Sequence, residues 1–161
     1  MVESARRVTA DVVIVGAGPA GSAAAIELAR AGRDVTVVDR AVFPRDKCCG
    51  DGLTTLALRE LEHLGLEPSS IDDWFDVDGA VIRSPSGRQV RVPLPDDGHY
   101  AAVAPRLQLD EAVVDLARKE GVTVCEGHAF QDITTHQDRV VVTADGLSIT
   151  ARYLLAADGM W

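Results

Sequence analysis

The feature that most constrains the fold is a glycine-rich segment, Gly16-Ala17-Gly18-Pro19-Ala20-Gly21, which lies between an apolar run and a helical pattern. The preceding run, Val12–Val15, is apolar throughout, as is typical of a buried parallel strand. A helix is expected from about Pro19 to Ala31, because proline is tolerated in the first helical turn and Gly32 is a natural stop. The pattern therefore predicts a strand, a tight turn and a helix in immediate succession.

A second short strand is expected at Val35–Val38, and it ends at Asp39. This arrangement, with the acidic residue about twenty positions after the glycines, matches the dinucleotide-binding fingerprint. Gly16 permits the tight turn, Gly18 lets the backbone approach a pyrophosphate, and Gly21 lets the helix pack closely on the sheet. The helix N-terminus offers N–H groups to phosphate, and Asp39 accepts hydrogen bonds from a ribose hydroxyl. A glycine turn used only for packing is the alternative.

The negative charge of Asp39 disfavours a ribose 2′-phosphate, and therefore NADP, in this pocket. FAD and NAD remain, and the fingerprint alone does not separate them. The net charge of −9 argues against nucleic acid as a partner. The histidines and cysteines show no zinc-ligand spacing, so no metal is expected. Three cysteines, two of them adjacent, favour reduced thiols and a cytoplasmic location.

The remaining residue patterns predict further helices and short strands. Helices are expected at Leu53–Leu64 and Arg106–Glu120, each followed by a glycine. Trp74 and Phe75 are interpreted as core anchors rather than substrate contacts. A hairpin is expected from Gly79–Ser84 and Gln89–Val92, and a buried strand at Val122–Cys125. An antiparallel meander is expected at Phe130–Thr135, Arg139–Thr143 and Leu147–Thr150, followed by a final apolar strand at Tyr153–Ala157.

A second distinctive segment, FPRDKCCGDGLT at residues 43–54, has adjacent cysteines and neither helical nor strand periodicity. Together with GAGPAG, PRLQLD at residues 105–110 and a strand ending in Ala157-Asp158-Gly159, it resembles the geranylgeranyl reductase family of flavoproteins. The resemblance covers essentially the whole chain and implies an α/β fold. This fold is a Rossmann-like FAD/NAD(P)-binding domain of glutathione-reductase or aromatic-hydroxylase type, with an antiparallel β-meander. Cys48 is a departure, because proline is expected there.

The resemblance implies FAD as the cofactor and a role for each matching residue. Arg45 and Arg106 would face phosphate or ribityl oxygens, and Ala129 would contact the adenine end. The flavin ring would pass Cys49 and Gly52, where glycine lets the backbone approach a flat ring. Cys49 is the candidate catalytic side chain, and a small residue without chemical use is the alternative. The implied cofactor-binding residues are Gly16, Gly18, Ala20, Gly21, Asp39, Arg40, Arg45, Cys49, Gly50, Gly52, Arg106, Ala129, Asp158 and Gly159.

Arg106 has support that does not depend on the resemblance. A cation at a helix N-terminus opposes the helix dipole, and a nearby anionic ligand would offset that cost. A solvated surface arginine following Pro105 is the alternative. The residue types therefore point to an anion near this end of the predicted helix.

The resemblance implies a flavin-dependent oxidoreductase that saturates an isoprenoid double bond, with electrons from NAD(P)H or another donor. An FAD-dependent monooxygenase or halogenase on the same fold is one alternative, and a non-catalytic dinucleotide-binding module is another. A lipid substrate would bring the protein to the inner membrane face. Residues 1–161 lack the family's later Gly-Asp-Ala segment, so they are expected to be the N-terminal part of a longer flavoprotein, truncated here. About residues 70–104 would begin a substrate-domain insertion.

Overall fold

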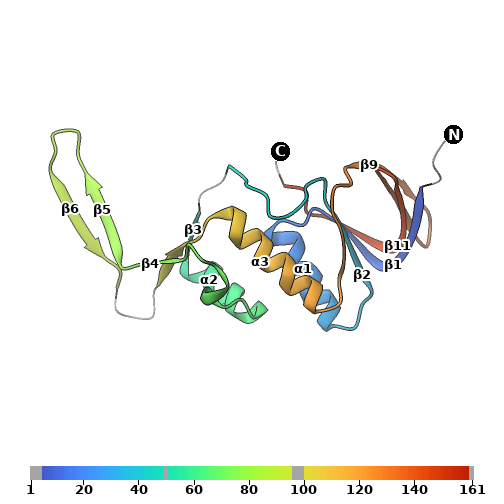
Figure 1. The fold of residues 1–161 in the computed structure, drawn as a ribbon, viewed down its shortest axis with the longest axis horizontal. Helices are drawn as coiled ribbons and strands as arrows, with labels where there is room; N and C mark the ends of the chain where they lie inside the picture. Colours follow the sequence, from blue (N-terminus) through green and yellow to red (C-terminus); the bar gives the residue numbers. More distant parts are fainter. Residues whose placement is uncertain (1–4, 49–50, 96–99, 160–161) are drawn as a thin grey trace.

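A computed structural model describes residues 5–48, 51–95 and 100–159 of the chain (Figure 1). Three α-helices and one short 3-10 helix are interspersed with eleven strands in this part of the chain. In chain order they are β1 (Arg6–Val15), α1 (Pro19–Arg30), β2 (Val35–Val38), β3 (Gly52–Leu53), α2 (Thr55–Leu64), η1 (Pro68–Ser70), β4 (Phe75–Val77), β5 (Gly79–Arg83), β6 (Gln89–Pro93), β7 (Ala101–Val103), α3 (Arg106–Lys119), β8 (Thr123–Cys125), β9 (Phe130–Thr135), β10 (Val140–Ala144) and β11 (Leu147–Ala156).

The main sheet has six strands in the order β8-β2-β1-β11-β10-β9. Strands β8, β2, β1 and β11 run parallel to one another, whereas β10 pairs antiparallel with both β11 and β9. The parallel half arises from the β-α-β unit, because a crossover helix brings the second strand back in the same direction. The predicted α/β fold with an antiparallel meander is therefore confirmed.

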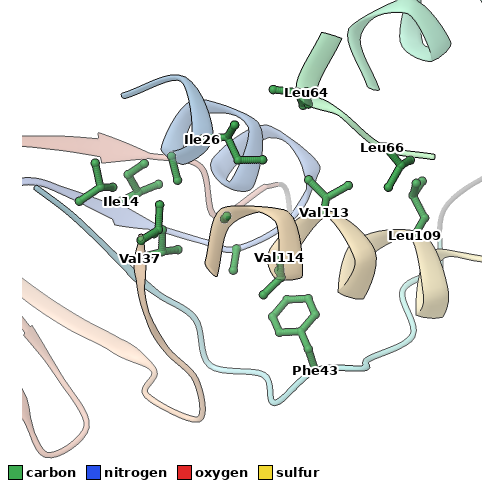
Figure 2. Close-up of a cluster of buried hydrophobic side chains, with 14 of the residues drawn as sticks. Ile14, Ile26, Val37, Phe43, Leu64, Leu66, Leu109, Val113 and Val114 are labelled. Carbon is green, nitrogen blue, oxygen red and sulfur yellow. The ribbon is translucent and has the colours of Figure 1, made fainter. Parts of the chain in front are cut away.

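One face of the sheet is covered by α1 and α3, which pack side by side (Figure 1). Ile14 and Val37 project from the strands towards Ile26 of α1 and Val114 of α3 (Figure 2). These side chains have at most 1% of their surface exposed. Each large side chain buried in this way contributes about 1.5–3 kcal/mol to folding. This core fixes both helices relative to the carboxyl ends of β1 and β2.

A second cluster of buried side chains lies on the opposite face of the sheet. Val13, next to Ile14 along β1, points to this face because side chains alternate along a strand. It packs with Val38, Val142 and Ile149, which joins the parallel half of the sheet to the meander. The meander is thus part of the same folded unit as the β-α-β motif.

Strand β11 differs from the sequence-based expectation. Two strands, at Leu147–Thr150 and Tyr153–Ala157, were expected, but residues 147–156 form one continuous strand. β1 is also longer than the predicted Val12–Val15, because it pairs with β11 from Arg6–Leu147 to Val15–Ala156. Pairing between these two distant segments therefore extends both strands into residues that are not apolar.

The boundaries of α2 and α3 are set by local features. Thr54 is the N-cap of α2, and its side chain accepts a hydrogen bond from Ala57 N at 3.4 Å, so the helix begins two residues after the predicted Leu53. Gly65 and Gly121 follow the two helices with φ values of 88° and 89°, as expected for glycine at a helix end.

A second region contains a small sheet, β3-β7-β4, and a separate hairpin of β5 and β6 that extends away from the body (Figure 1). The predicted hairpin is confirmed, with Gly87 in the left-handed conformation at its turn. Trp74 packs against the main core, as expected, but Phe75 is 65% exposed and the prediction that it anchors the core is wrong. Phe75 is the first residue of β4, and the next residue, Asp76, is exposed as well.

Candidate dinucleotide-binding site

A cavity of about 780 Å³ opens at the carboxyl ends of β1, β2 and β11. Ligands of open α/β sheets bind at this edge, and the volume lies within the range of about 300–1,000 Å³ found for small-molecule and cofactor sites. The cavity is therefore the candidate site of the glycine-rich fingerprint. The residues that line it are Gly16, Gly18, Pro19, Ala20, Asp39, Arg40, Ala41, Arg45, Asp46, Lys47, Cys48, Arg106, Ala157, Asp158 and Gly159.

Two glycines of the fingerprint are required by packing. Gly16 has a φ of 103°, and a Cβ atom added there would lie 2.3 Å from the carbonyl oxygen of Ala157. A Cβ atom added to Gly21 would lie 1.9 Å from the carbonyl oxygen of Gly16. Both positions therefore allow strand, turn and helix to pack against the end of β11. Gly21 lies behind the cavity lining, and its predicted contact with a cofactor stays a prediction.

Gly18 has a different role from Gly16 and Gly21. It is the N-cap of α1 with extended backbone angles, and a Cβ atom there would meet only Arg45 Nη2, at 3.6 Å. Among the described residues, no side chain caps this end of α1, and its first turn contains no acidic residue. The first amide groups of α1 face the cavity beside Gly18 and Ala20 and can bind an anion such as phosphate.

Asp39 connects the glycine-rich turn to the end of β2. Its Oδ2 accepts a hydrogen bond from Ala17 N at 2.7 Å, and its Oδ1 accepts one from Ala41 N at 2.8 Å. A carboxylate has about four acceptor positions, so these bonds leave capacity for a ribose hydroxyl. Asp39 thus holds the turn in place, a role not predicted from the sequence, and still lines the cavity.

A smaller cavity of about 250 Å³ adjoins the first and shares four of its lining residues. Ala129 lines this second space beside Asp39 and Arg40, and His128 N donates to Asp39 O at 2.9 Å. The structure therefore brings Ala129 next to the acidic end of β2, although the two segments are far apart in sequence. Arg40 borders both cavities.

Arg45 and Arg106 meet at one buried carboxylate, that of Asp110. Asp110 is 0% exposed, and its Oδ1 and Oδ2 accept hydrogen bonds from Arg106 Nε at 2.7 Å and Nη2 at 2.8 Å. Arg45 Nη1 lies 2.8 Å from Asp110 Oδ2, and its guanidinium group lies over the Phe43 ring at 5.1 Å. The cation at the start of α3 thus has an internal counter-ion in addition to the expected ligand.

The Arg45 contact is an ion pair rather than a well-formed hydrogen bond. Nη1 is buried and has no hydrogen-bond partner among the described residues, although it lies close to the Asp110 carboxylate. A buried donor of this kind is satisfied when an anion enters the adjoining space.

The loop after β2 contributes Asp46, Lys47 and Cys48 to the cavity lining. Cys48 is an exposed free thiol. Cys49 and Gly50, the predicted flavin contacts, lie outside the described residues. Gly52 pairs with Val103 in the small sheet and does not line the cavity, but nothing lies within 4 Å of a Cβ atom placed on it.

The segment at the end of β11 completes the cavity, and the predicted contact of Asp158 and Gly159 with FAD stays a prediction. Asp158 and Gly159 line it together with Ala157, and Gly159 has a φ of 75°. Sequence reasoning missed Asp110, although its spacing of four residues from Arg106 on a helix is a recognisable ion-pair signal. No group of three or more potential metal ligands is found within residues 5–48, 51–95 and 100–159.

Four features of the cavity fit FAD. They are its volume, the uncapped N-terminus of α1, the open space at Gly18 and the buried unused donor of Arg45. The volume accommodates a large ligand, and the other three features favour a pyrophosphate.

Comparison with known proteins identifies this arrangement. Residues 9–161 match the family described as FAD binding domain. The chain belongs to this family. FAD is therefore its cofactor, and the choice between FAD and NAD that the fingerprint left open is settled.

Two curated relatives extend the family match. The chain is 44% identical over 158 residues to a menaquinone reductase of Mycolicibacterium smegmatis, covering 93% of this chain and 37% of that protein. It is 36% identical to digeranylgeranylglycerophospholipid reductase 2 of Methanopyrus kandleri, covering 93% and 37%. The latter confirms the resemblance to geranylgeranyl reductases. The chain thus spans a little over a third of the length of these relatives.

The solved structure of the myxobacterial chondrochloren halogenase, an FAD-dependent halogenase, shares the fold. The TM-score is 0.78 at 22% identity, covering 94% of this chain and 38% of the halogenase. This identity supports a common fold alone. The FAD-binding architecture is therefore common to reductases and to enzymes with other flavin chemistry.

Proposed function

We propose that this chain is the FAD-binding part of a flavin-dependent reductase that saturates a double bond in an isoprenoid chain. The observation that carries the proposal is the pair of relatives at 44% and 36% identity, one named for menaquinone and the other for a digeranylgeranyl phospholipid. Menaquinone and geranylgeranyl lipids both carry isoprenoid chains. A lipophilic, isoprenoid-bearing substrate is the chemistry that these two names share.

The residues that line the cavity would hold FAD. The first turn of α1 beside Gly18 would bind the pyrophosphate, together with the guanidinium groups of Arg45 and Arg106. Asp39 would accept hydrogen bonds from the adenosine ribose, and Ala129 would border the adenine. By the family resemblance, Cys49 and Gly52 would contact the isoalloxazine ring. Bound FAD supplies hydride transfer to the substrate, and the protein supplies orientation and a dry site.

Three further assignments belong to this proposal. Cys49 would be the reactive side chain nearest to the flavin ring. Residues 70–104 would form the beginning of a substrate domain, because the hairpin of β5 and β6 extends away from the FAD-binding body (Figure 1). NAD(P)H or another small donor would supply electrons, and a lipid substrate would bring the protein to a membrane surface. No helix in the part of the chain that the structure describes is long and apolar enough to cross a bilayer.

A test of the proposal uses the natural full-length protein. We expect the purified protein to be yellow, with the visible absorption of oxidised flavin. After anaerobic reduction, adding a geranylgeranyl lipid should reoxidise the flavin and yield a lipid heavier by two hydrogens. A fully saturated phytanyl lipid of the same head group is the control, and it should leave the flavin reduced.

The same assay separates the alternatives. With menaquinone as substrate, fragmentation of the product locates the added hydrogens, and a change confined to the quinone ring would contradict alkene reduction. A product that forms only in air and carries oxygen or halogen would favour the monooxygenase or halogenase alternative. A full-length protein that stays colourless after FAD is added would favour a non-catalytic module.

A further inference from the structure

We propose that Asp110 is a positioning residue for FAD, an internal anion that holds Arg45 and Arg106 in the orientation that binds the pyrophosphate. This inference rests on FAD binding by the family and not on the proposed substrate. Asp110 would act through the arginines rather than on the cofactor, because both arginines line the cavity and Asp110 does not.

Asp110 occupies an unusual place for a carboxylate. It lies on the buried side of α3 next to Leu109, and it is 0% exposed. Burying a charge is costly unless it is paired, and replacing a buried ion pair by apolar residues often leaves a protein equally stable. Stability alone therefore does not explain the residue, whereas a function that needs its charge does.

The geometry shows what the charge does. Arg106 is the first residue of α3, and Arg45 belongs to the loop after β2, so the two come from separate segments. Asp110 Oδ2 is shared between them, at 2.8 Å from Arg106 Nη2 and 2.8 Å from Arg45 Nη1. One carboxylate thus fixes two long, flexible side chains before any ligand binds. Such preorganisation increases affinity, because the ordering cost is met in advance.

The fixed guanidinium groups face the right part of the cavity. A Cβ atom on Gly18 would lie 3.6 Å from Arg45 Nη2, so the Arg45 guanidinium lies beside the N-terminus of α1. Arg45, Arg106 and Asp110 together carry one net positive charge. The Asp51 carboxylate lies nearby, where its Oδ1 accepts a hydrogen bond from Arg106 N at 3.3 Å. The donors of α1 and the cation therefore face the same space, the one in which a pyrophosphate would sit.

Replacing Asp110 by asparagine in the full-length protein tests the proposal. The amide would keep one oxygen acceptor but lose the negative charge, and its NH2 group would face a guanidinium donor at the other position. We expect the Kd for FAD of the apo-protein to rise at least about tenfold, the size of one lost charged hydrogen bond. We expect the Kd for riboflavin, which lacks the pyrophosphate and adenylate, to stay within about twofold, since the arginines would not contact it.

Asp138→Asn is the matched control. Asp138 pairs with Arg139 at 3.1 Å, but it is exposed and neither residue lines the cavity, so FAD binding should not change. Thermal unfolding of each apo-protein checks folding. If Asp110→Asn does not fold, Asp110→Glu, which keeps the charge but displaces it by one methylene group, should show the same selective loss. Equal weakening of FAD and riboflavin, or no weakening of either, would overturn the proposal.

Discussion

Gly18 and Gly21 belong to one motif, but the structure assigns them separate tasks, and two alanine variants can distinguish these. In Gly21→Ala, the new Cβ atom would lie 1.9 Å from the carbonyl oxygen of Gly16, whereas such contacts are essentially never below 3.0 Å. Helix α1 would have to move away from the turn. In Gly18→Ala, the new atom would meet only Arg45 Nη2, at 3.6 Å, in an ordinary van der Waals contact.

The expected magnitudes follow from these contacts. Moving α1 disturbs the packing of Ala25 and Ile26, both 0% exposed, and overpacking of this kind costs about 1–3 kcal/mol or more. Alanine at Gly18 is a poorer N-cap by about 0.5–1 kcal/mol, but it restricts the unfolded chain by about 0.4–1 kcal/mol, since the backbone there is extended. Gly21→Ala should therefore lower the unfolding free energy, and Gly18→Ala should leave it nearly unchanged.

Thermal unfolding of the apo-proteins and titration with FAD measure the two effects separately. We expect the Tm of Gly21→Ala to fall by about 2–12 °C, from a cost of about 1–3 kcal/mol and about 2–4 °C for each kcal/mol. Gly18→Ala should melt within about 2 °C of the parent but bind FAD at least about tenfold more weakly, because its methyl group occupies phosphate space. If Gly21→Ala kept the parental Tm, or Gly18→Ala kept the parental Kd, the division of roles would be refuted.

Three further predictions concern residues around the site and the core. Asp39→Asn should lower the unfolding free energy by about 1–3 kcal/mol in urea titrations, because one of the amides of Ala17 and Ala41 would lose its acceptor; an unchanged midpoint would contradict this. Thr54→Ala should cost about 0.5 kcal/mol in the same assay, the low end for an N-cap, because its bond is 3.4 Å long; a cost above about 2 kcal/mol would point to another role. Burial raises the pKa of the Cys125 thiol, and the charge of Arg6 partly opposes this shift. In a Cys48→Ser/Cys49→Ser variant, Cys125 should therefore be alkylated more slowly at pH 8.5 in the folded protein than in urea. Equal alkylation rates would refute the shift. Its contribution to stability should be complete below the ordinary thiol pKa and be lost as pH rises through the higher native pKa.

The parts of the fold that could be predicted from the sequence are those determined by local chemistry. The boundaries of β2 match the prediction, because four consecutive apolar residues end at an acidic one. The glycines that end α2 and α3 have the left-handed conformation that only glycine adopts readily. A hairpin turn at residues 84–88 is likewise a local property. In each case a few adjacent residues carry the information.

What could not be predicted depends on pairing between distant segments. β1 extends back to Arg6 because β11 lies beside it, and the expected break within β11 is absent for the same reason. Strands β3 and β7 are two and three residues long; β3 pairs with β7, and β7 pairs with β4 as well. Such strands have no periodicity of their own to detect. Tertiary contacts therefore override the local pattern at these positions.

The candidate site also has one part that depends on local sequence and one that depends on distant contacts. The fingerprint turn and Asp39 form a local unit at the cavity. The position of the loop after β2 depends instead on a helix and a strand that are distant in the sequence. Phe43 N donates to Glu126 Oε1 at 3.1 Å, and that carboxylate is held by Arg118 of α3 at 2.7 Å. The same helix holds this loop again through Asp110 and Arg45.

Helix α3 is consequently the element that unites the two halves of the site. At its start it directs Arg106 into the cavity, four residues later it fixes Arg45 through Asp110, and at its end Arg118 anchors the loop through Glu126. Because α3 packs beside α1 (Figure 1), the cations and the phosphate-binding amides form one rigid arrangement. A motif search that finds only the glycines locates the anion site of α1. The charge that complements it comes from a helix about ninety residues further along the chain, and only the packing of α1 against α3 brings the two together.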